Sequence, residues 1–201
     1  MRYKSVRLLL AAEINFFVML GVCYLLDPHV PTDKYGISYY GNYLRTLIPY
    51  ALAFVVSGTL ILWATSAVRA ASTELERARL GLRLLGVLMI CLVFVPSLFN
   101  AFVGKIHVVI GGGIFLDQML LTVWFVHWHK RSFINFGLLT VMVLSGVVTG
   151  LSVPDVVDIM FVMHVIYQLA AGMLMVQALA YWLEHSTAVA TSEYERKIIN
   201  S

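Results

Sequence analysis

Charged residues are scarce in this chain, and their scarcity excludes most soluble architectures. Of its 201 residues, 12% are charged and 60% are hydrophobic. A soluble domain of this size needs more polar residues to cover its surface. Cysteine is rare as well: Cys23 and Cys91 lie in apolar stretches, without the spacing of a zinc site or a disulfide framework. We expect both to be small buried side chains.

Long apolar runs take the place of polar surface. Each run is about 20 residues long, the length with which a helix crosses about 30 Å of hydrocarbon. The runs lack the alternation of a transmembrane barrel. We predict an all-α integral membrane bundle of six transmembrane helices, over residues 7–26, 46–67, 84–104, 106–127, 133–151 and 157–183. Residues 1–184 would form this domain, and 185–201 a polar cytoplasmic tail.

Basic residues predict the orientation of the bundle. Of the 14 lysines and arginines, only Lys34, Arg45 and Lys105 fall in segments that would lie outside if the N-terminus lies inside. This asymmetry follows the positive-inside rule and predicts that both termini are cytoplasmic. The basic residues flank the apolar runs, so we expect no nucleic-acid partner. The compact loops favour a bacterial plasma membrane.

Four ionisable residues lie inside the predicted spans: Glu13, His107, Asp117 and His164. Such residues are costly in a bilayer, so each is a candidate functional residue. Asp117 lies about 16 Å into its run, near the middle of the bilayer. No lysine or arginine lies in the interior of a run to neutralise it. A proton, a histidine, a hydroxyl group or a bound cation must do so.

Several of these polar side chains fall at similar depth in the outer half of the predicted bundle. Pro96 is expected to kink the third helix. We therefore predict an outward-facing polar pocket, with Asp117 at its floor and with these candidate lining residues: Asn100, His107, His164 and Gln168. Gln118, which lies on the same helix face as His107, belongs to the same region. The alternative is that each polar group makes one hydrogen bond between helices and has no other role.

Two cofactor hypotheses follow from the histidines, although we predict no cofactor and no metal. His107 and His164 could be axial ligands of one haem, because they lie at compatible depths. Together with Asp117 they could supply three zinc ligands for an intramembrane hydrolase. No HxxxH pair or other spaced motif supports either hypothesis.

Small and aromatic residues give packing signals. Gly146 and Gly150 form a GxxxG pair, which permits close approach of another helix from the same chain or from another subunit. The loop over residues 27–45 contains Tyr35, Tyr39, Tyr40 and Tyr43. These tyrosines predict an interfacial aromatic belt, or a lid over the pocket.

The segment Tyr35–Asn42, with its Ile37-Ser38 and Gly41, and the following helix over Thr46–Trp63 resemble a known group. This group is the six-helix DRAM/Frag-type membrane proteins and their bacterial uncharacterised relatives. Pro96, followed eleven residues later by His107, is a second shared feature. The resemblance implies a six-helix fold, a role in lipid homeostasis or trafficking, and no enzyme activity. It carries over to Ser38, Gly41 and His107.

The sequence therefore favours a non-enzymatic membrane protein that binds or moves a lipid or small solute through an outward-facing polar pocket. Its partners would be membrane lipid and, in a second hypothesis, other membrane subunits. In this second hypothesis the chain is a structural subunit of a larger complex. The third hypothesis is the metal-dependent hydrolase or haem carrier.

Overall fold

Helices account for all the regular structure in the part of the chain that the computed structural model describes. This part comprises residues 2–29, 36–68, 73–97, 100–128, 132–152 and 159–199, and it contains no strand. The elements are α1 (Arg2–Leu26), η2 (Ile37–Asn42), α2 (Leu44–Ser66), α3 (Thr73–Val93), α4 (Ala101–Trp128), α5 (Phe133–Ser152) and α6 (Met160–Ile199). The prediction of an all-α fold is confirmed. The count of six helices is corrected, because the described residues form seven: the segment before α2 contains the 3-10 helix η2.

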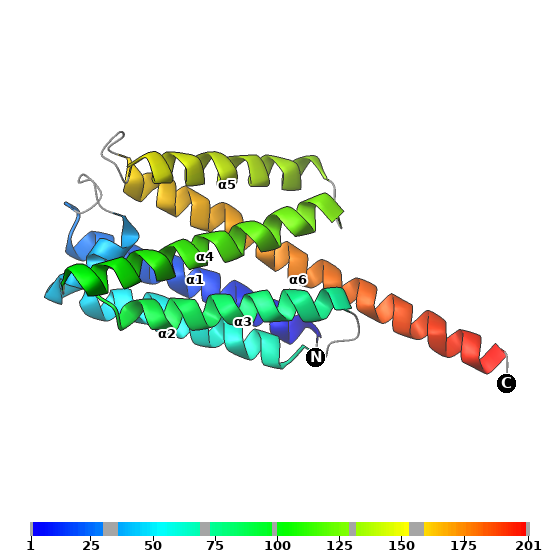
Figure 1. Ribbon diagram of the computed structural model, residues 1–201. Coiled ribbons are helices and arrows are strands. Elements are labelled where there is room, and N and C mark those ends of the chain that lie inside the picture. Colours follow the sequence, from blue (N-terminus) through cyan, green and yellow to red (C-terminus); the bar gives the residue numbers. More distant parts are fainter. Residues whose placement is uncertain are drawn as a thin grey trace.

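The six long helices lie side by side in one bundle, with η2 at one end (Figure 1). We call this the η2 end. The N-terminus lies at the opposite end, from which α6 extends beyond the other helices (Figure 1). The most extensive packing joins α1 to α2, α2 to α3, and α5 to α6. The α4 helix makes fewer contacts with α5 and α6.

The third predicted helix was misplaced. It covers Thr73–Val93 rather than 84–104, and Pro96 lies in the connection to α4 instead of kinking a helix. Proline lacks a backbone N–H and disfavours helical backbone at the preceding residue, so it ends the helix here. The helix begins at Thr73, and Glu74 and Glu76 in its first turn suit its N-terminus.

Among the described residues, four helices are long and apolar enough to cross a membrane: Lys4–Leu26 of α1, all of α2, Ala101–His127 of α4, and Met160–Glu184 of α6. The described apolar part of α5, Phe133–Thr149, is shorter. Large hydrophobic side chains are exposed along the outside of the bundle, among them Leu44, Val109 and Phe133. An apolar exterior of this extent is unusual for a monomeric soluble protein.

Polar contacts join α1 to α2 inside the bundle. The Ser57 hydroxyl donates to the Ala12 carbonyl oxygen (2.7 Å), and the Asn15 amide donates to the Ser57 hydroxyl oxygen (3.0 Å). Asn15 also donates to the Leu52 carbonyl oxygen at 3.1 Å. In apolar surroundings these hydrogen bonds fix the position of α1 along α2.

Glycines permit a close contact between the backbones of α2 and α3. A Cβ atom built on Gly58 would lie 2.7 Å from the Gly86 carbonyl oxygen, and one built on Gly86 would lie 2.9 Å from the Gly58 carbonyl oxygen. No side chain fits between the two backbones at this distance. A single glycine in each helix therefore sets their separation.

A third contact joins α1 to α6. The Glu13 carboxylate lies directly against Gly172, where any Cβ atom would overlap it. Glu13 thus packs between the two helices.

Candidate functional site

A glutamine pair links α4 to α6 near the middle of the bundle. The Gln118 amide nitrogen donates to the Gln168 side-chain oxygen at 2.8 Å. Gln118 is only 3% exposed, and its own side-chain oxygen has no hydrogen-bond partner among the described residues. A buried acceptor without a partner costs free energy, so this oxygen is suited to accept a hydrogen bond from a bound group.

Asp117 precedes Gln118 and lies near Tyr167 of α6, close enough for an electrostatic interaction with its hydroxyl group. The Tyr167 hydroxyl donates to the Phe115 carbonyl oxygen (2.7 Å), so its proton is already engaged. The Asp117 Oδ2 atom is buried and has no hydrogen-bond partner in the described part of the chain. Asp117 and Gln118 therefore present two oxygen acceptors near neighbouring residues of α6.

His164 lies one turn before Gln168 on α6 and connects the glutamine pair to η2. The Ile37 backbone N–H donates to His164 Nδ1 at 3.4 Å. Gly36 lies against the imidazole ring, where any Cβ atom would overlap it. The Phe115 ring lies 5.0 Å from the His164 ring, centre to centre. His164, Gln168 and Gly172 follow at intervals of four residues, so the three share one face of α6.

The η2 segment packs into the end of the bundle. Tyr40 is buried, with its ring 5.8 Å from that of Phe161 in an edge-to-face contact. The Thr46 hydroxyl donates to the Tyr40 carbonyl oxygen at 2.6 Å. Tyr43 is exposed, as an interfacial tyrosine would be, whereas Tyr40 belongs to the core. Tyr35 lies outside the described residues.

The residues taken from the family resemblance have local roles here. Gly41 faces the Tyr50 ring, and a Cβ atom built on it would lie 2.6 Å from that ring. Ser38 is half-buried in η2. His107 Nδ1 lies 2.6 Å from the Val95 carbonyl oxygen, which can only accept, so Nδ1 carries the proton.

Asn100 is the N-cap of α4. The Val103 backbone N–H donates to Asn100 Oδ1 at 2.8 Å, and the side chain is exposed. Asn100 and His107 thus make their hydrogen bonds around the connection between α3 and α4. Asp117, His164 and Gln168, in contrast, lie where α4 meets α6.

Gly146 of α5 packs against a side chain of α6 in the same chain. A Cβ atom built on Gly146 would lie 3.2 Å from the Tyr167 ring, so α5 approaches α6 closely here. Gly150 belongs to α5, but its surroundings lie outside the described contacts. The Gly146 half of the GxxxG pair therefore packs against α6 of the same chain.

Within the described residues, no group of three or more His, Cys, Asp and Glu side chains could hold a metal ion.

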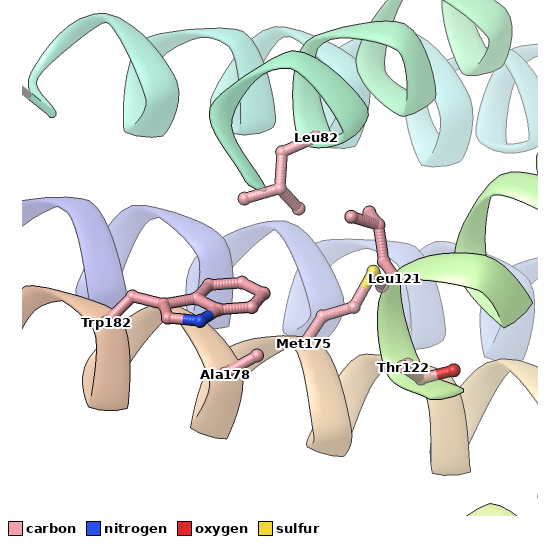
Figure 2. A pocket seen from close by; sticks show the side chains of 6 residues that line it. All are labelled: Leu82, Leu121, Thr122, Met175, Ala178 and Trp182. Carbon is pink, nitrogen blue, oxygen red and sulfur yellow. The ribbon is translucent and has the colours of Figure 1, made fainter. Parts of the chain in front are cut away.

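One small cavity of about 10 Å³ lies between α3, α4 and α6, nearer the end opposite η2. Figure 2 shows the side chains of Leu82, Met175 and Trp182 pointing toward it, with Leu121, Thr122 and Ala178 beside them. Its volume is about what one water molecule needs, and its lining is mostly apolar. It is too small to hold a solute.

The sequence analysis missed four contact residues: Asn15, Ser57, Gly58 and Gly86. Asn15 and Ser57 could have been found, because a polar side chain in an apolar run needs a partner on another helix. Gly58 and Gly86 give no such signal, since neither belongs to a spaced glycine pair.

Comparisons with known proteins identify no relative. No protein-family model matches the chain, and neither the comparison with curated proteins nor that with solved structures finds a similar protein. The resemblance to the DRAM/Frag-type group therefore stays a prediction, and the fold and the α4–α6 contact carry the functional argument.

Proposed function

We propose that this chain is an integral membrane protein with six spans and both termini in the cytoplasm. Four helices meet the length and apolarity of a span, and α3 and α5 run alongside them in the same bundle. The exposed apolar exterior supports contact with lipid. Arg7 and Arg77 belong to the end opposite η2, whereas Arg45 and Lys105 belong to the η2 end. This distribution supports a cytoplasmic location for the end opposite η2.

The protein binds or moves a small solute at the contact between α4 and α6, through a pocket that opens toward the η2 end. The observation that supports this function is the pair of buried oxygens, Asp117 Oδ2 and Gln118 Oε1, which have no partner among the described residues. Membrane helices rarely bury a carboxyl group that is not neutralised, because this is costly in hydrocarbon.

The geometry favours a solute that donates hydrogen bonds or carries positive charge. Both oxygens are acceptors when Asp117 is ionised, and the nearby Tyr167 hydroxyl already donates to Phe115. The rings of Phe115 and Tyr167, with centres 4.3 Å apart, would form an aromatic wall beside the solute. A donor group would satisfy the oxygens and lower the cost of burying them.

Entry from the η2 end requires a movement of η2. His164 lies between Asp117 and this end, and it binds η2 through the Ile37 backbone. For the segment to lift away from α6, this hydrogen bond of 3.4 Å and the ring contact of Tyr40 with Phe161 would both have to break. This arrangement suits the lid hypothesis for the loop over residues 27–45.

Native mass spectrometry of the detergent-purified protein tests this function. We expect a small molecule to remain bound to the wild type and to be lost in Asp117→Asn, because the substitution removes the anionic acceptor. Glu13→Gln is the matched control, since it changes the other carboxyl group of the bundle interior and should keep the ligand. Equal retention in both variants would refute the site.

The same measurement tests the structural-subunit hypothesis. A partner protein that co-purifies, with no small molecule bound, would favour that hypothesis. Gly146 does not support it, because Tyr167 of the same chain already lies against this glycine.

A further inference from the structure

A surface groove runs along α3, away from the Asp117 site. It is shallow and open, with a volume of about 510 Å³, and all its lining residues belong to α3: Arg77, Leu80, Gly81, Arg83, Leu84 and Val87. Leu121 of α4 packs against Gly81, 2.7 Å from where a Cβ atom would lie. The groove therefore adjoins α4 at Gly81.

The groove is lined by two kinds of side chain, arginines and apolar residues. Arg77 belongs to the second turn of α3, near the start of the helix, and Arg83 follows six residues later. The apolar part is highly exposed: Leu80 is 62%, Leu84 51% and Val87 46% exposed. Spacings of three and four residues place Arg77, Leu80, Leu84 and Val87 along one helix face.

The two arginines have no ion-pair partner in the part of the chain that the structure describes. Arg79, on the same helix, differs from them: it binds Glu76 at 2.6 Å. Glu74, three residues before Arg77, makes no ion pair with it among the described contacts. The groove thus combines two unpaired positive charges with a continuous apolar strip.

We propose that this groove binds one anionic phospholipid of the cytoplasmic leaflet. Guanidinium groups form paired hydrogen bonds with phosphate oxygens, so Arg77 and Arg83 would hold the headgroup. One acyl chain would lie along Leu80, Leu84 and Val87. A zwitterionic lipid carries its own positive charge beside the phosphate, which makes it the weaker ligand. This site adds to the proposed solute site and does not depend on Asp117.

Lipid competition tests the proposal. The purified protein is placed in nanodiscs with equal amounts of phosphatidylglycerol and phosphatidylcholine that carry the same acyl chains. The lipids that stay bound on release are then counted by native mass spectrometry. We expect one retained phosphatidylglycerol in the wild type. Arg77→Gln and Arg83→Gln should each lower the ratio of phosphatidylglycerol to phosphatidylcholine about fivefold.

Two controls make the result specific. Arg7→Gln removes one exposed charge at the same end of the bundle but outside the groove, and it should leave the ratio unchanged. Asp117→Asn should also leave it unchanged, so failure of the solute site cannot be mistaken for failure of the groove. The proposal is overturned if both groove variants keep the wild-type ratio, or if Arg7→Gln lowers it equally. Both arginines are exposed, so the single variants should keep the wild-type unfolding midpoint.

Discussion

Replacement of Gly58 by alanine tests the close contact between α2 and α3. The new Cβ atom would lie 2.7 Å from the Gly86 carbonyl oxygen and 2.8 Å from a side-chain carbon of Ile90. Carbon and carbonyl oxygen atoms approach to about 3.3 Å in the tightest helix contacts. The two helices would have to separate by roughly half an ångström, and the Gly86 oxygen cannot rotate away because it belongs to the backbone.

The expected cost comes from two opposing effects. Overpacking of a tight contact destabilises by about 1–3 kcal/mol. Alanine gains about 1 kcal/mol over glycine in a helix interior. We therefore expect Gly58→Ala to lower the free energy of unfolding by about 0–2 kcal/mol.

Gly112→Ala is the matched control, because a Cβ atom on Gly112 meets nothing within 4 Å. This variant gains the same helix propensity without overpacking, so it should be about 1 kcal/mol more stable than wild type. The difference between the two variants isolates the contact and should be about 1–3 kcal/mol. Unfolding by SDS in mixed micelles, followed by tryptophan fluorescence, measures it. Equal stability of the two variants would refute the described approach of α2 to α3.

Two further substitutions test polar contacts. Ser57→Ala removes the hydrogen bonds to Ala12 and from Asn15, and should lower the free energy of unfolding by about 1–2 kcal/mol in the same assay. The control, Thr59→Val, removes only a hydrogen bond within its own helix and should lower it less. An equal loss in both variants would contradict the α1–α2 contact. His107→Leu leaves the Val95 carbonyl oxygen without its partner, so it should lower the free energy of unfolding by about 1–3 kcal/mol. It should also speed amide hydrogen exchange around Pro96. Unchanged exchange there would show that this hydrogen bond does not hold the connection between α3 and α4.

The sequence predicted the helices well where an apolar run ended at a clear polar boundary. Thus α2 begins two residues before its predicted start at 46 and ends one residue before its predicted end at 67. The start of the third helix at Thr73 agrees with the capping pattern of Thr73, Glu74 and Glu76. Its end was placed too late, at 104 instead of Val93, because Pro96 was interpreted as a kink. The η2 helix was missed because its backbone is set by tertiary contacts with α2 and α6.

The candidate site was predicted only in part, for a physical reason. Helical periodicity places His164 and Gln168 on one face, and the structure places both beside α4. Periodicity cannot say which helix a polar side chain meets. Asn100 and His107 were therefore assigned to the pocket, although Asn100 caps α4 and His107 binds the Val95 carbonyl oxygen.

Cysteine accessibility at Asp117 tests the proposed pocket most directly. Asp117→Cys is made after Cys23 and Cys91 are replaced by alanine, and intact vesicles are treated with a small charged thiol reagent that does not cross the bilayer. Leu116→Cys is the control, because Leu116 is the neighbouring residue and is 53% exposed on the apolar exterior. We predict modification of the cysteine at 117 from the η2 side and none at 116. Protection of both positions, or equal modification of both, would contradict a polar pocket between α4 and α6.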